Sequence, residues 1–218
     1  MARRLPLSRA TRAFVVLALA GSAFGCADGD SDYERFGGLL TNYFHSDPGV
    51  QLSVPASIPY ATMGVNIGSS SQAVFVLATT QTGGDQMWLA GKQAALVTRD
   101  GRIVRTSGLD QNLLGRRVLS EGGERGNLYF YDLSGPKTYN LLVRCSAQDA
   151  GVEQISILGA QLNTHHVVEH CEADSVSWAF DNEYWQDPAT GFVWRSVQYV
   201  HPQQPAIRMD VFRPPSSS

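Results

Sequence analysis

The Asp100-Gly101 pair constrains the fold of this chain more than any other feature of the sequence. An Asp-Gly pair supplies the positive φ angles that a two-residue type I′ turn requires. β-prone segments, residues 95–99 and 102–106, flank the pair on both sides. The stretch 88–108 therefore predicts a β-hairpin around which the remaining strands must be arranged.

Counting outward from this turn predicts the register of the hairpin. The predicted pairs are Arg99 with Arg102, Thr98 with Ile103, Val97 with Val104, and Leu96 with Arg105. Apolar residues then fall on both faces, and a hairpin of this kind needs cover on both sides. We therefore expect it to be an inner part of a sheet. We interpret the arginines at its turn, Arg99 and Arg102, as solvated or partner-facing.

Short strand-like segments separated by turns continue along the rest of the chain. The candidates are residues 60–67, 73–79, 87–90, 127–133, 139–146, 152–161, 165–171, 175–185, 192–200 and 206–212. Residues 109–119 are expected to form a helical turn, and the apolar spacing over 33–44 predicts a short amphipathic helix. The pattern predicts a mainly β domain, with antiparallel sheets packed as a sandwich or as a strongly curved or bifurcated sheet, and a short N-terminal helix.

The first 25 residues have the pattern of a secretory signal. Four arginines precede an apolar run, residues 13–20, that is too short to cross a bilayer, where about 20 residues are needed. The following Ala23-Phe24-Gly25-Cys26 resembles the bacterial lipobox, in which the cysteine becomes the lipid-modified first residue. The alternative is an ordinary cleavage site followed by a coincidental cysteine.

This leader predicts the domain organisation and the cellular location of the protein. Residues 1–25 would be the signal peptide, 26–50 the lipid anchor, tether and short helix, and 51–218 a single β-rich periplasmic domain. Position 27 is Ala and not the Asp of the enteric inner-membrane retention rule. We therefore expect a protein anchored to the outer membrane through the lipid on Cys26, with its domain in the periplasm.

The cysteine count predicts a disulfide, and the charge balance limits the kinds of partner that the protein could bind. Two cysteines other than Cys26 remain, Cys145 and Cys171, and an even number in an oxidising compartment predicts a disulfide. Two separate buried thiols are the alternative. The chain has 17 basic residues, four of them in the leader, against 20 acidic residues. This balance argues against nucleic acid as a partner, whereas a neutral glycan or another protein remains open.

A second predicted hairpin, around residues 187–191, holds the most aromatic part of the chain. Tyr184 and Trp185 precede its turn, and Trp194 follows it. Aromatic rings stack on sugars, but they also fill cores, which is their commoner role. Tyr184, Trp185 and Trp194, together with Arg99 and Arg102, form our candidate surface for a glycan or a protein partner.

The sequence shows little that indicates catalysis or metal binding. His165, His166, His170 and Cys171 lie close together, but a zinc site needs ligands that converge from two elements, and hydrogen-bonded histidines are the simpler interpretation. The chain has no Gly-x-Ser-x-Gly elbow, phosphate loop or His-Glu-x-x-His motif. We expect no cofactor, no metal and no enzymatic activity.

Several motifs, in a fixed order, carry a resemblance to a known family. They are Ile58-Pro59-Tyr60-Ala61-Thr62-Met63, then Trp88 with the hairpin at 95–106 and Gly108-Leu109, and later Tyr184-Trp185 with Gly191-Phe192-Val193-Trp194-Arg195-Ser196. Together with the lipobox, they resemble the YjbF/GfcB lipoprotein family, which belongs to operons for exopolysaccharide and group 4 capsule production. The resemblance implies an outer-membrane lipoprotein of mainly β fold that works with polysaccharide-secretion proteins, and it supplies no catalytic residues.

Two functional hypotheses follow from the sequence. The first is a non-enzymatic accessory factor in exopolysaccharide or capsule assembly or secretion, with other secretion proteins and the exopolysaccharide itself as candidate partners. The second is a periplasmic lipid carrier, because residues 184–191 also look like a strand-turn segment of LolA/LolB-like curved sheets. Turn chemistry alone favours the Asp-Pro-x-Thr-Gly part of that segment.

Overall fold

A computed structural model describes residues 59–91, 94–123, 126–135 and 138–215 of the chain. The strands in these ranges are β1 (Thr62–Ile67), β2 (Ala73–Thr80), β3 (Gln86–Ala90), β4 (Ala94–Arg99), β5 (Arg102–Ser107), β6 (Leu113–Gly123), β7 (Gly126–Leu133), β8 (Thr138–Ile157), β9 (Ala160–Ala173), β10 (Trp178–Gln186), β11 (Val193–Gln198) and β12 (Ile207–Arg213). A short 3-10 helix, η1 (Asp174–Val176), joins β9 to β10. The predicted mainly β, antiparallel fold is confirmed.

Two predictions concerning helices have different outcomes. The amphipathic helix predicted over 33–44 lies outside the described residues, as do the leader (1–25) and the anchor and tether (26–50). The helical turn predicted over 109–119 is wrong, because β6 already begins at Leu113. Asn112 closes the preceding loop by accepting a hydrogen bond from the Leu109 N–H (3.2 Å) and donating one to the Leu109 carbonyl (2.8 Å). Those bonds satisfy the loop backbone without a helical turn.

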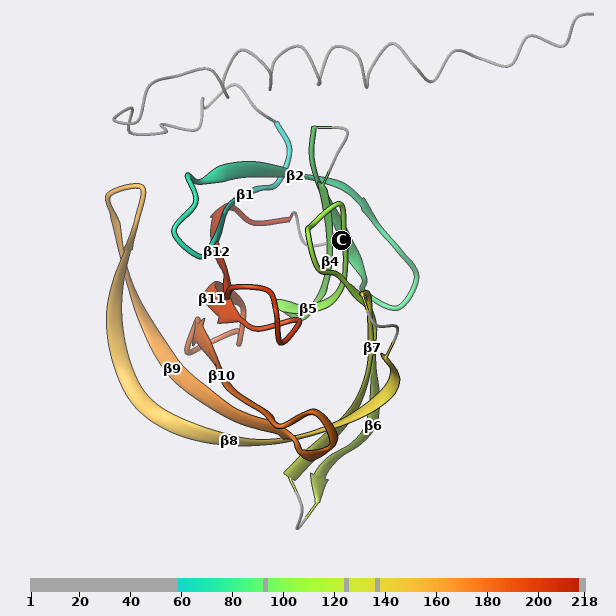
Figure 1. The fold of residues 1–218 in the computed structure, drawn as a ribbon. Helices are drawn as coiled ribbons and strands as arrows, with labels where there is room; N and C mark the ends of the chain where they lie inside the picture. Colours follow the sequence, from blue (N-terminus) through green and yellow to red (C-terminus); the bar gives the residue numbers. More distant parts are fainter. Residues whose placement is uncertain (1–58, 92–93, 124–125, 136–137, 216–218) are drawn as a thin grey trace, which may run out of the picture.

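All the described strands belong to one strongly curved sheet. The hydrogen-bonded order is β5-β4-β3-β2-β1-β12-β11-β10-β9-β8-β7-β6. Its two end strands, β5 and β6, lie close together, so the sheet nearly closes on itself (Figure 1). Thr106 of β5 accepts a hydrogen bond from the backbone N–H of Leu113 in β6 (2.9 Å). We call this junction between β5 and β6 the seam.

The long β8–β9 hairpin extends past the rest of the sheet and covers its outer side. β10 pairs with β9 from His165 to Ala173, so the distal part of the hairpin continues beyond β10 as a wide arc (Figure 1). Ile155 and Ile157 in that part pack with Trp185 in a second hydrophobic cluster. A side-chain N–H of Arg195 in β11 also donates to the Ser156 carbonyl (2.8 Å). These contacts hold the hairpin against the sheet.

The predicted disulfide is present in the same hairpin. Cys145 of β8 and Cys171 of β9 are directly opposite each other in the register, and their sulfur atoms are bonded. Both side chains are buried in the main core. The disulfide therefore crosslinks the two strands of the hairpin within the main core.

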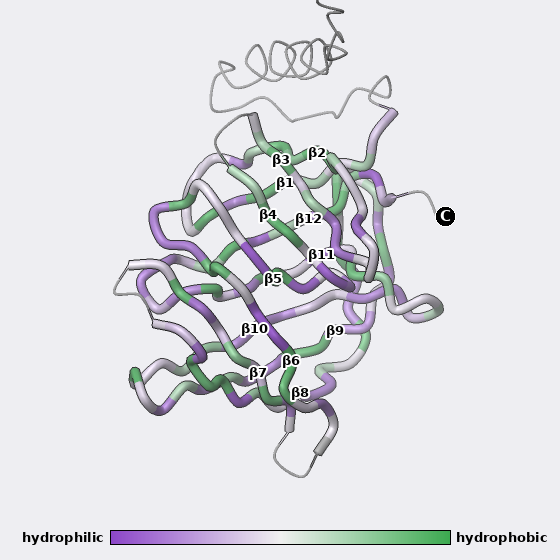
Figure 2. Tube along the Cα trace, turned by 90° about the vertical axis from the view of Figure 1, so that its right-hand side faces the viewer, coloured by the Kyte–Doolittle hydropathy of each residue, from purple (hydrophilic) through white to green (hydrophobic). Residues whose placement is uncertain are grey.

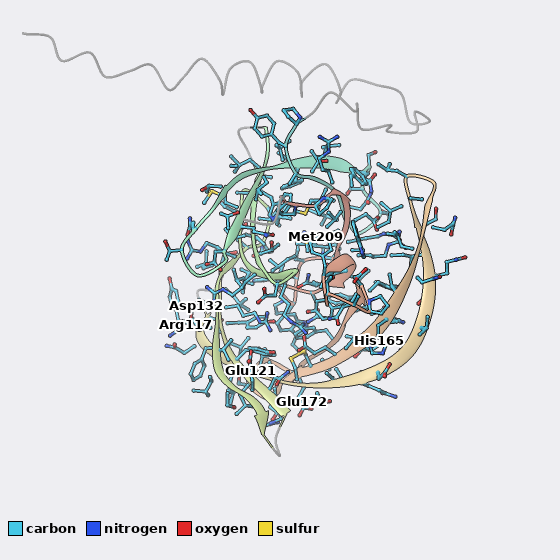
Figure 3. The ribbon with its side chains drawn as sticks, turned by 180° about the vertical axis from the view of Figure 1, so that it is seen from behind. Arg117, Glu121, Asp132, His165, Glu172 and Met209 are labelled. Carbon is cyan, nitrogen blue, oxygen red and sulfur yellow. A yellow bond between two sulfur atoms is a disulfide. The ribbon has the colours of Figure 1, made fainter. Side chains whose placement is uncertain are left out.

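Side chains fill the interior of the curled sheet. Hydrophobic and hydrophilic stretches alternate along the strands (Figure 2), as expected when one face of each strand is buried. Met63, Trp88, Leu96 and Tyr131 are among the buried residues of the main cluster. Figure 3 shows Met209 of β12 near the middle of the molecule. A cavity of about 30 Å³ lies beside Trp88, Trp194 and Met209, which is room for very few water molecules.

The Asp100-Gly101 turn forms as predicted, but the register beyond it changes. Both turn residues have positive φ, 51° and 73°, and the first two predicted pairs are confirmed. A bulge between Val97 and Thr98 then pairs Val97 with Arg105 and Leu96 with Thr106. The predicted pairs Val97–Val104 and Leu96–Arg105 are wrong because one extra residue in β5 turns the buried Thr106 towards the seam.

The hairpin is also not an inner part of the sheet, because β5 is one end of the strand order. No further strand pairs with the free edge of β5 among the described strands. The inner face of the hairpin is covered by the opposite wall of the curled sheet. Gln198 of β11 accepts a hydrogen bond from the Ile103 N–H (2.9 Å) and donates one to the Gly101 carbonyl (2.9 Å). One side chain thus connects the turn to the opposite wall of the curl.

The Gly101 turn leaves no room for a methyl group, which predicts a large effect of Gly101→Ala. A Cβ there would lie 2.4 Å from the Cβ of Val193, whereas a Cβ at Gly191, which has the same φ of 73°, would meet nothing within 4 Å. Gly191→Ala should lose about 1 kcal/mol of unfolding free energy through backbone strain alone. Gly101→Ala should lose roughly 1–3 kcal/mol more through overpacking. Urea denaturation measures both losses. Equal losses would contradict the prediction, because they would mean that the Val193 side chain moves aside with no loss of unfolding free energy.

Candidate functional site

Five residues from five strands meet on the inner side of the seam, and we call them the seam cluster. They are Arg102 of β5, Arg116 of β6, Tyr129 of β7, Glu169 of β9 and Tyr184 of β10. Strand alternation brings them to one face: Glu169 lies two residues before the buried Cys171, and Tyr129 lies two residues before the buried Tyr131. The curl of the sheet then brings the strands together.

Glu169 is the centre of this cluster and has no exposed surface. One carboxylate oxygen accepts hydrogen bonds from the Arg102 guanidinium (3.3 Å), the Tyr184 hydroxyl (3.3 Å) and the Asn182 amide (3.4 Å). The other oxygen accepts one from the Tyr129 hydroxyl (3.3 Å). Burying a carboxylate is costly unless it is paired and hydrogen-bonded. Four donors from three other strands, β5, β7 and β10, meet that requirement.

The two arginines of the cluster differ in their partners. The guanidinium carbon of Arg102 lies 4.1 Å from the centre of the Tyr184 ring, and that of Arg116 lies 3.9 Å from the centre of the Tyr129 ring. Arg102 also forms an ion pair with Glu169. Arg116 has no carboxylate partner among the described residues, and its buried Nε atom has no hydrogen-bond acceptor there. The seam cluster therefore holds two positive charges and one negative charge.

The surroundings keep both arginines charged and the phenols neutral. Burial on its own would lower the pKa of Arg116, but Tyr131, Tyr184, Tyr129 and Glu169 raise it overall. Burial likewise opposes the charge of Arg102, yet Tyr184 and Glu169 raise its pKa. Burial raises the pKa of Tyr131 to about 12 and also raises that of Tyr184. The cluster therefore presents positive charge and neutral hydroxyl groups at neutral pH.

The five residues predicted to form a glycan or partner surface do not share one surface. Arg102 and Tyr184 belong to the seam cluster, where Tyr184 is buried. Trp185 points to the opposite face of β10 and is also buried. Trp194 is half-buried beside Phe192, with ring centres 4.9 Å apart. Arg99 is exposed and pairs with Asp85 at 2.7 Å.

His166 and His170 of β9 lie on the face that carries Trp185, whereas His165 lies on the opposite face. Each of the three has a carboxylate partner. His165 contacts Asp149 (2.8 Å) and His170 contacts Asp181 (2.6 Å). The ring of His166 stacks on Trp185 with centres 4.4 Å apart. Its two nitrogens contact Glu153 (3.2 Å) and Glu183 (2.9 Å).

The described residues bring one group of candidate metal ligands together: Cys145, Glu169 and Cys171. Both of its sulfur atoms belong to the disulfide, so neither is available as a thiolate ligand.

Arg116, Tyr129 and Glu169 were missed as site residues by the sequence-based prediction. The available signal was the placement of Glu169 on the same strand face as Cys171, where a charge is unexpected next to a buried disulfide. Nothing in the spacing of Arg116 relates it to Glu169, since 53 positions separate them. Their proximity depends on the curl.

Removing the charge of Glu169 should destabilise the protein, because the arginines would lose their buried counter-charge. We expect Glu169→Gln to reduce the unfolding free energy by roughly 2–4 kcal/mol. Glu172→Gln is the matched control, since Glu172 is also in β9 and pairs with Arg144 (2.9 Å) but is 55% exposed. That change should cost less than about 1 kcal/mol in urea denaturation. A smaller loss at position 169 than at 172 would contradict the central place given to Glu169.

The raised pKa of Tyr131 predicts a loss of stability at alkaline pH. An unfolded tyrosine ionises near its usual pKa of about 10, whereas folded Tyr131 keeps its proton to about 12. The unfolded state then binds fewer protons, so stability falls as pH rises above about 10. The Tyr131 contribution should be about 1 kcal/mol between about pH 9 and about pH 11. Tyr131→Phe should reduce this fall in urea denaturation, while Tyr139→Phe, which removes an exposed phenol, should leave it unchanged.

Comparison with known proteins identifies the family. Residues 40–212 match the family model described as "Group 4 capsule polysaccharide lipoprotein gfcB, YjbF". The lipoprotein YjbF of Escherichia coli (strain K12) is 34% identical over 179 residues, which cover 77% of this chain and 82% of the relative. The lipoprotein GfcB of the same organism is 25% identical over 170 residues, covering 72% of this chain and 78% of that protein.

A solved structure supports the fold. The crystal structure of the hypothetical lipoprotein YmcC from Escherichia coli (K12) matches with a TM-score of 0.69 and 22% sequence identity. The match covers 86% of this chain and 98% of the other. The part of the chain described here contains no helix that is long and apolar enough to cross a membrane. The resemblance noted from the motifs is confirmed: the chain belongs to the YjbF/GfcB family of group 4 capsule polysaccharide lipoproteins.

Proposed function

We propose that this protein is a non-enzymatic accessory lipoprotein in the assembly or secretion of a capsule or exopolysaccharide. The observation that carries the proposal is the family match over residues 40–212, because its description names both a lipoprotein and a capsule polysaccharide. In this proposal, lipid on Cys26 anchors the protein to the outer membrane and the β domain works in the periplasm beside other polysaccharide-secretion proteins. The disulfide supports the oxidising compartment.

The contacts of the ionisable side chains support a role other than catalysis. Glycosidases use pairs of carboxylates, and the carboxylates near the aromatic hairpin are Asp181, Glu183 and Asp187. Asp181 contacts His170, and Glu183 contacts His166. Asp187 organises the turn before β11 by accepting hydrogen bonds from the N–H groups of Ala189 (3.0 Å) and Thr190 (2.9 Å). These carboxylates are engaged in holding strands and turns together, which favours an accessory role.

The lipid-carrier alternative is not favoured by the packing. A carrier of this kind needs an apolar cavity large enough for an acyl chain. The described interior of the curl is instead occupied by buried side chains such as Met63, Trp88 and Tyr131. A charged group, the seam cluster, also lies within it. An acyl chain placed there would desolvate the partly exposed Arg102 and Arg116 without offering them hydrogen-bond acceptors.

Deleting the gene in its own host tests the proposed function. Surface-attached and released polysaccharide should both be measured, and we expect the deletion to lower at least one of them. Wild-type protein should restore it, whereas Cys26→Ala, which removes the proposed lipidation site, should restore it poorly and leave the outer-membrane fraction. Unchanged polysaccharide in the deletion strain would refute the proposal. Cleavage of the purified polysaccharide by the purified protein would refute its non-enzymatic part.

A further inference from the structure

We propose that the seam cluster binds an oxyanion carried on a sugar, such as the carboxylate of a uronic acid unit or a sugar phosphate, with Arg116 as its principal ligand. This inference rests on the proposed function, since it identifies the part of a polysaccharide that the protein would contact. The feature that carries it is the charged guanidinium of Arg116, which has no carboxylate partner in the described ranges of the chain.

The first step is the hydrogen-bond inventory around Glu169. Arg102, Tyr129, Asn182 and Tyr184 already supply four donors to its two oxygens. Three of these donors bond to one carboxylate oxygen and Tyr129 bonds to the other, so both oxygens already accept hydrogen bonds. Arg116 is not among these donors, and the structure gives no hydrogen bond between Arg116 and Glu169.

The second step is the environment of Arg116 itself. Its contact with the Tyr129 ring is a cation–π interaction, which stabilises the charge but supplies no hydrogen-bond acceptor to its N–H groups. The Nε atom is shielded from solvent and has no acceptor among the described residues. Buried charges in proteins are normally paired with an opposite charge. An external oxyanion at the solvent-exposed part of the Arg116 side chain would supply the negative charge that no described carboxylate provides in an ion pair.

The third step is access. β5 and β6 stand at the two ends of the hydrogen-bonded strand order, so the seam is the place where the backbone ladder around the curl is interrupted. Arg116 lies in β6 and is only partly buried, and the Arg102 side chain in β5 remains 26% exposed. Both arginines therefore keep surface in contact with solvent, and an anion can reach them without entering the apolar core.

The fourth step is the kind of ligand. Guanidinium groups recognise carboxylate and phosphate oxygens by planar, paired hydrogen bonds. The chain as a whole is acidic, with 20 Asp and Glu residues against 17 Lys and Arg residues before removal of the leader. General attraction of polyanions is then weak, so binding would require the local positive charge of the seam. Neighbouring tyrosines add aromatic faces and hydroxyl groups of the type that contact sugars.

Isothermal titration calorimetry on the detergent-solubilised, full-length mature lipoprotein tests the site. The probes are a glucuronic acid trisaccharide, glucose 6-phosphate, inorganic phosphate and glucose. We expect the trisaccharide or the sugar phosphate to bind and glucose not to bind. Whichever of the two binds more tightly identifies the source of the oxyanion, and binding of inorganic phosphate alone would overturn the requirement for a sugar. Failure of all three anions to bind would overturn the site.

The affinities of variants at the adjacent residues Arg116 and Arg117 show which arginine binds the anion. Arg116→Gln should weaken affinity at least about ten-fold, the loss expected for one charge-assisted hydrogen bond, and Arg116→Lys should retain part of it. Arg117→Gln is the matched control, because Arg117 points outward with 56% of its side chain exposed and lies beside Asp132 (Figure 3). It should change affinity less than about two-fold. Equal effects of Arg116→Gln and Arg117→Gln would overturn the assignment.

Folding and function controls separate the possible failures. Arg116→Gln removes a partly buried charge that has no carboxylate partner among the described residues, so its urea midpoint should equal or exceed that of the wild type. If it fails to fold, Arg116→Lys with increasing salt provides the same comparison, because oxyanion binding should weaken as salt rises. Full complementation of the deletion strain by Arg116→Gln would remove the site while leaving the proposed function intact. If the protein binds the oxyanion but its deletion leaves the polysaccharide unchanged, the proposed function is refuted while the binding site stands.

Discussion

The hydrogen bonds to the buried carboxylate of Glu169 are the interactions on which the rest of the structure depends. Their donors come from β5, β7 and β10, so one side chain of β9 links strands that are far apart in the sheet order. A buried carboxylate left without these donors would cost several kcal/mol, and the strands must therefore curl far enough to supply them. Backbone hydrogen bonds define which strands are neighbours, but contacts across the interior determine how tightly the sheet closes.

The sequence predicted local features well because local chemistry determines them. The Asp100-Gly101 turn needs only positive φ at two residues, and the Cys145–Cys171 disulfide was predicted from the cysteine count and the expected oxidising compartment. The register beyond Thr98 was not predictable in this way, because the bulge depends on Thr106 reaching the backbone of Leu113 in another strand. The seam cluster was missed for the same reason: Arg116 and Glu169 become neighbours only when the sheet curls.

The two faces of β9 and β10 explain why neighbouring aromatic residues have different roles. Tyr184 points into the curl and donates to Glu169, whereas Trp185 faces outward, donates to Glu153 (2.8 Å) and stacks on His166. A strand turns successive side chains to opposite faces, so the Tyr184-Trp185 pair could not form one binding surface. Both faces are nevertheless covered, one by the curl and the other by the distal part of the β8–β9 hairpin. This double cover makes β10 a rigid support for the seam cluster.

Stability alone does not account for Arg116. Replacing buried ionic groups by apolar residues of similar size is often neutral or stabilising, so a partly buried charge needs a specific reason to be present. Arg102 has such a reason, because it neutralises Glu169 and packs on Tyr184. Arg116 shares the environment but forms no ion pair with a carboxylate in the part of the chain that the structure describes, and its contact with Tyr129 offsets only part of the desolvation cost. A group that meets an anion from outside satisfies the chemistry of this position, and it does so at the one junction where the wall of the curl has no backbone ladder.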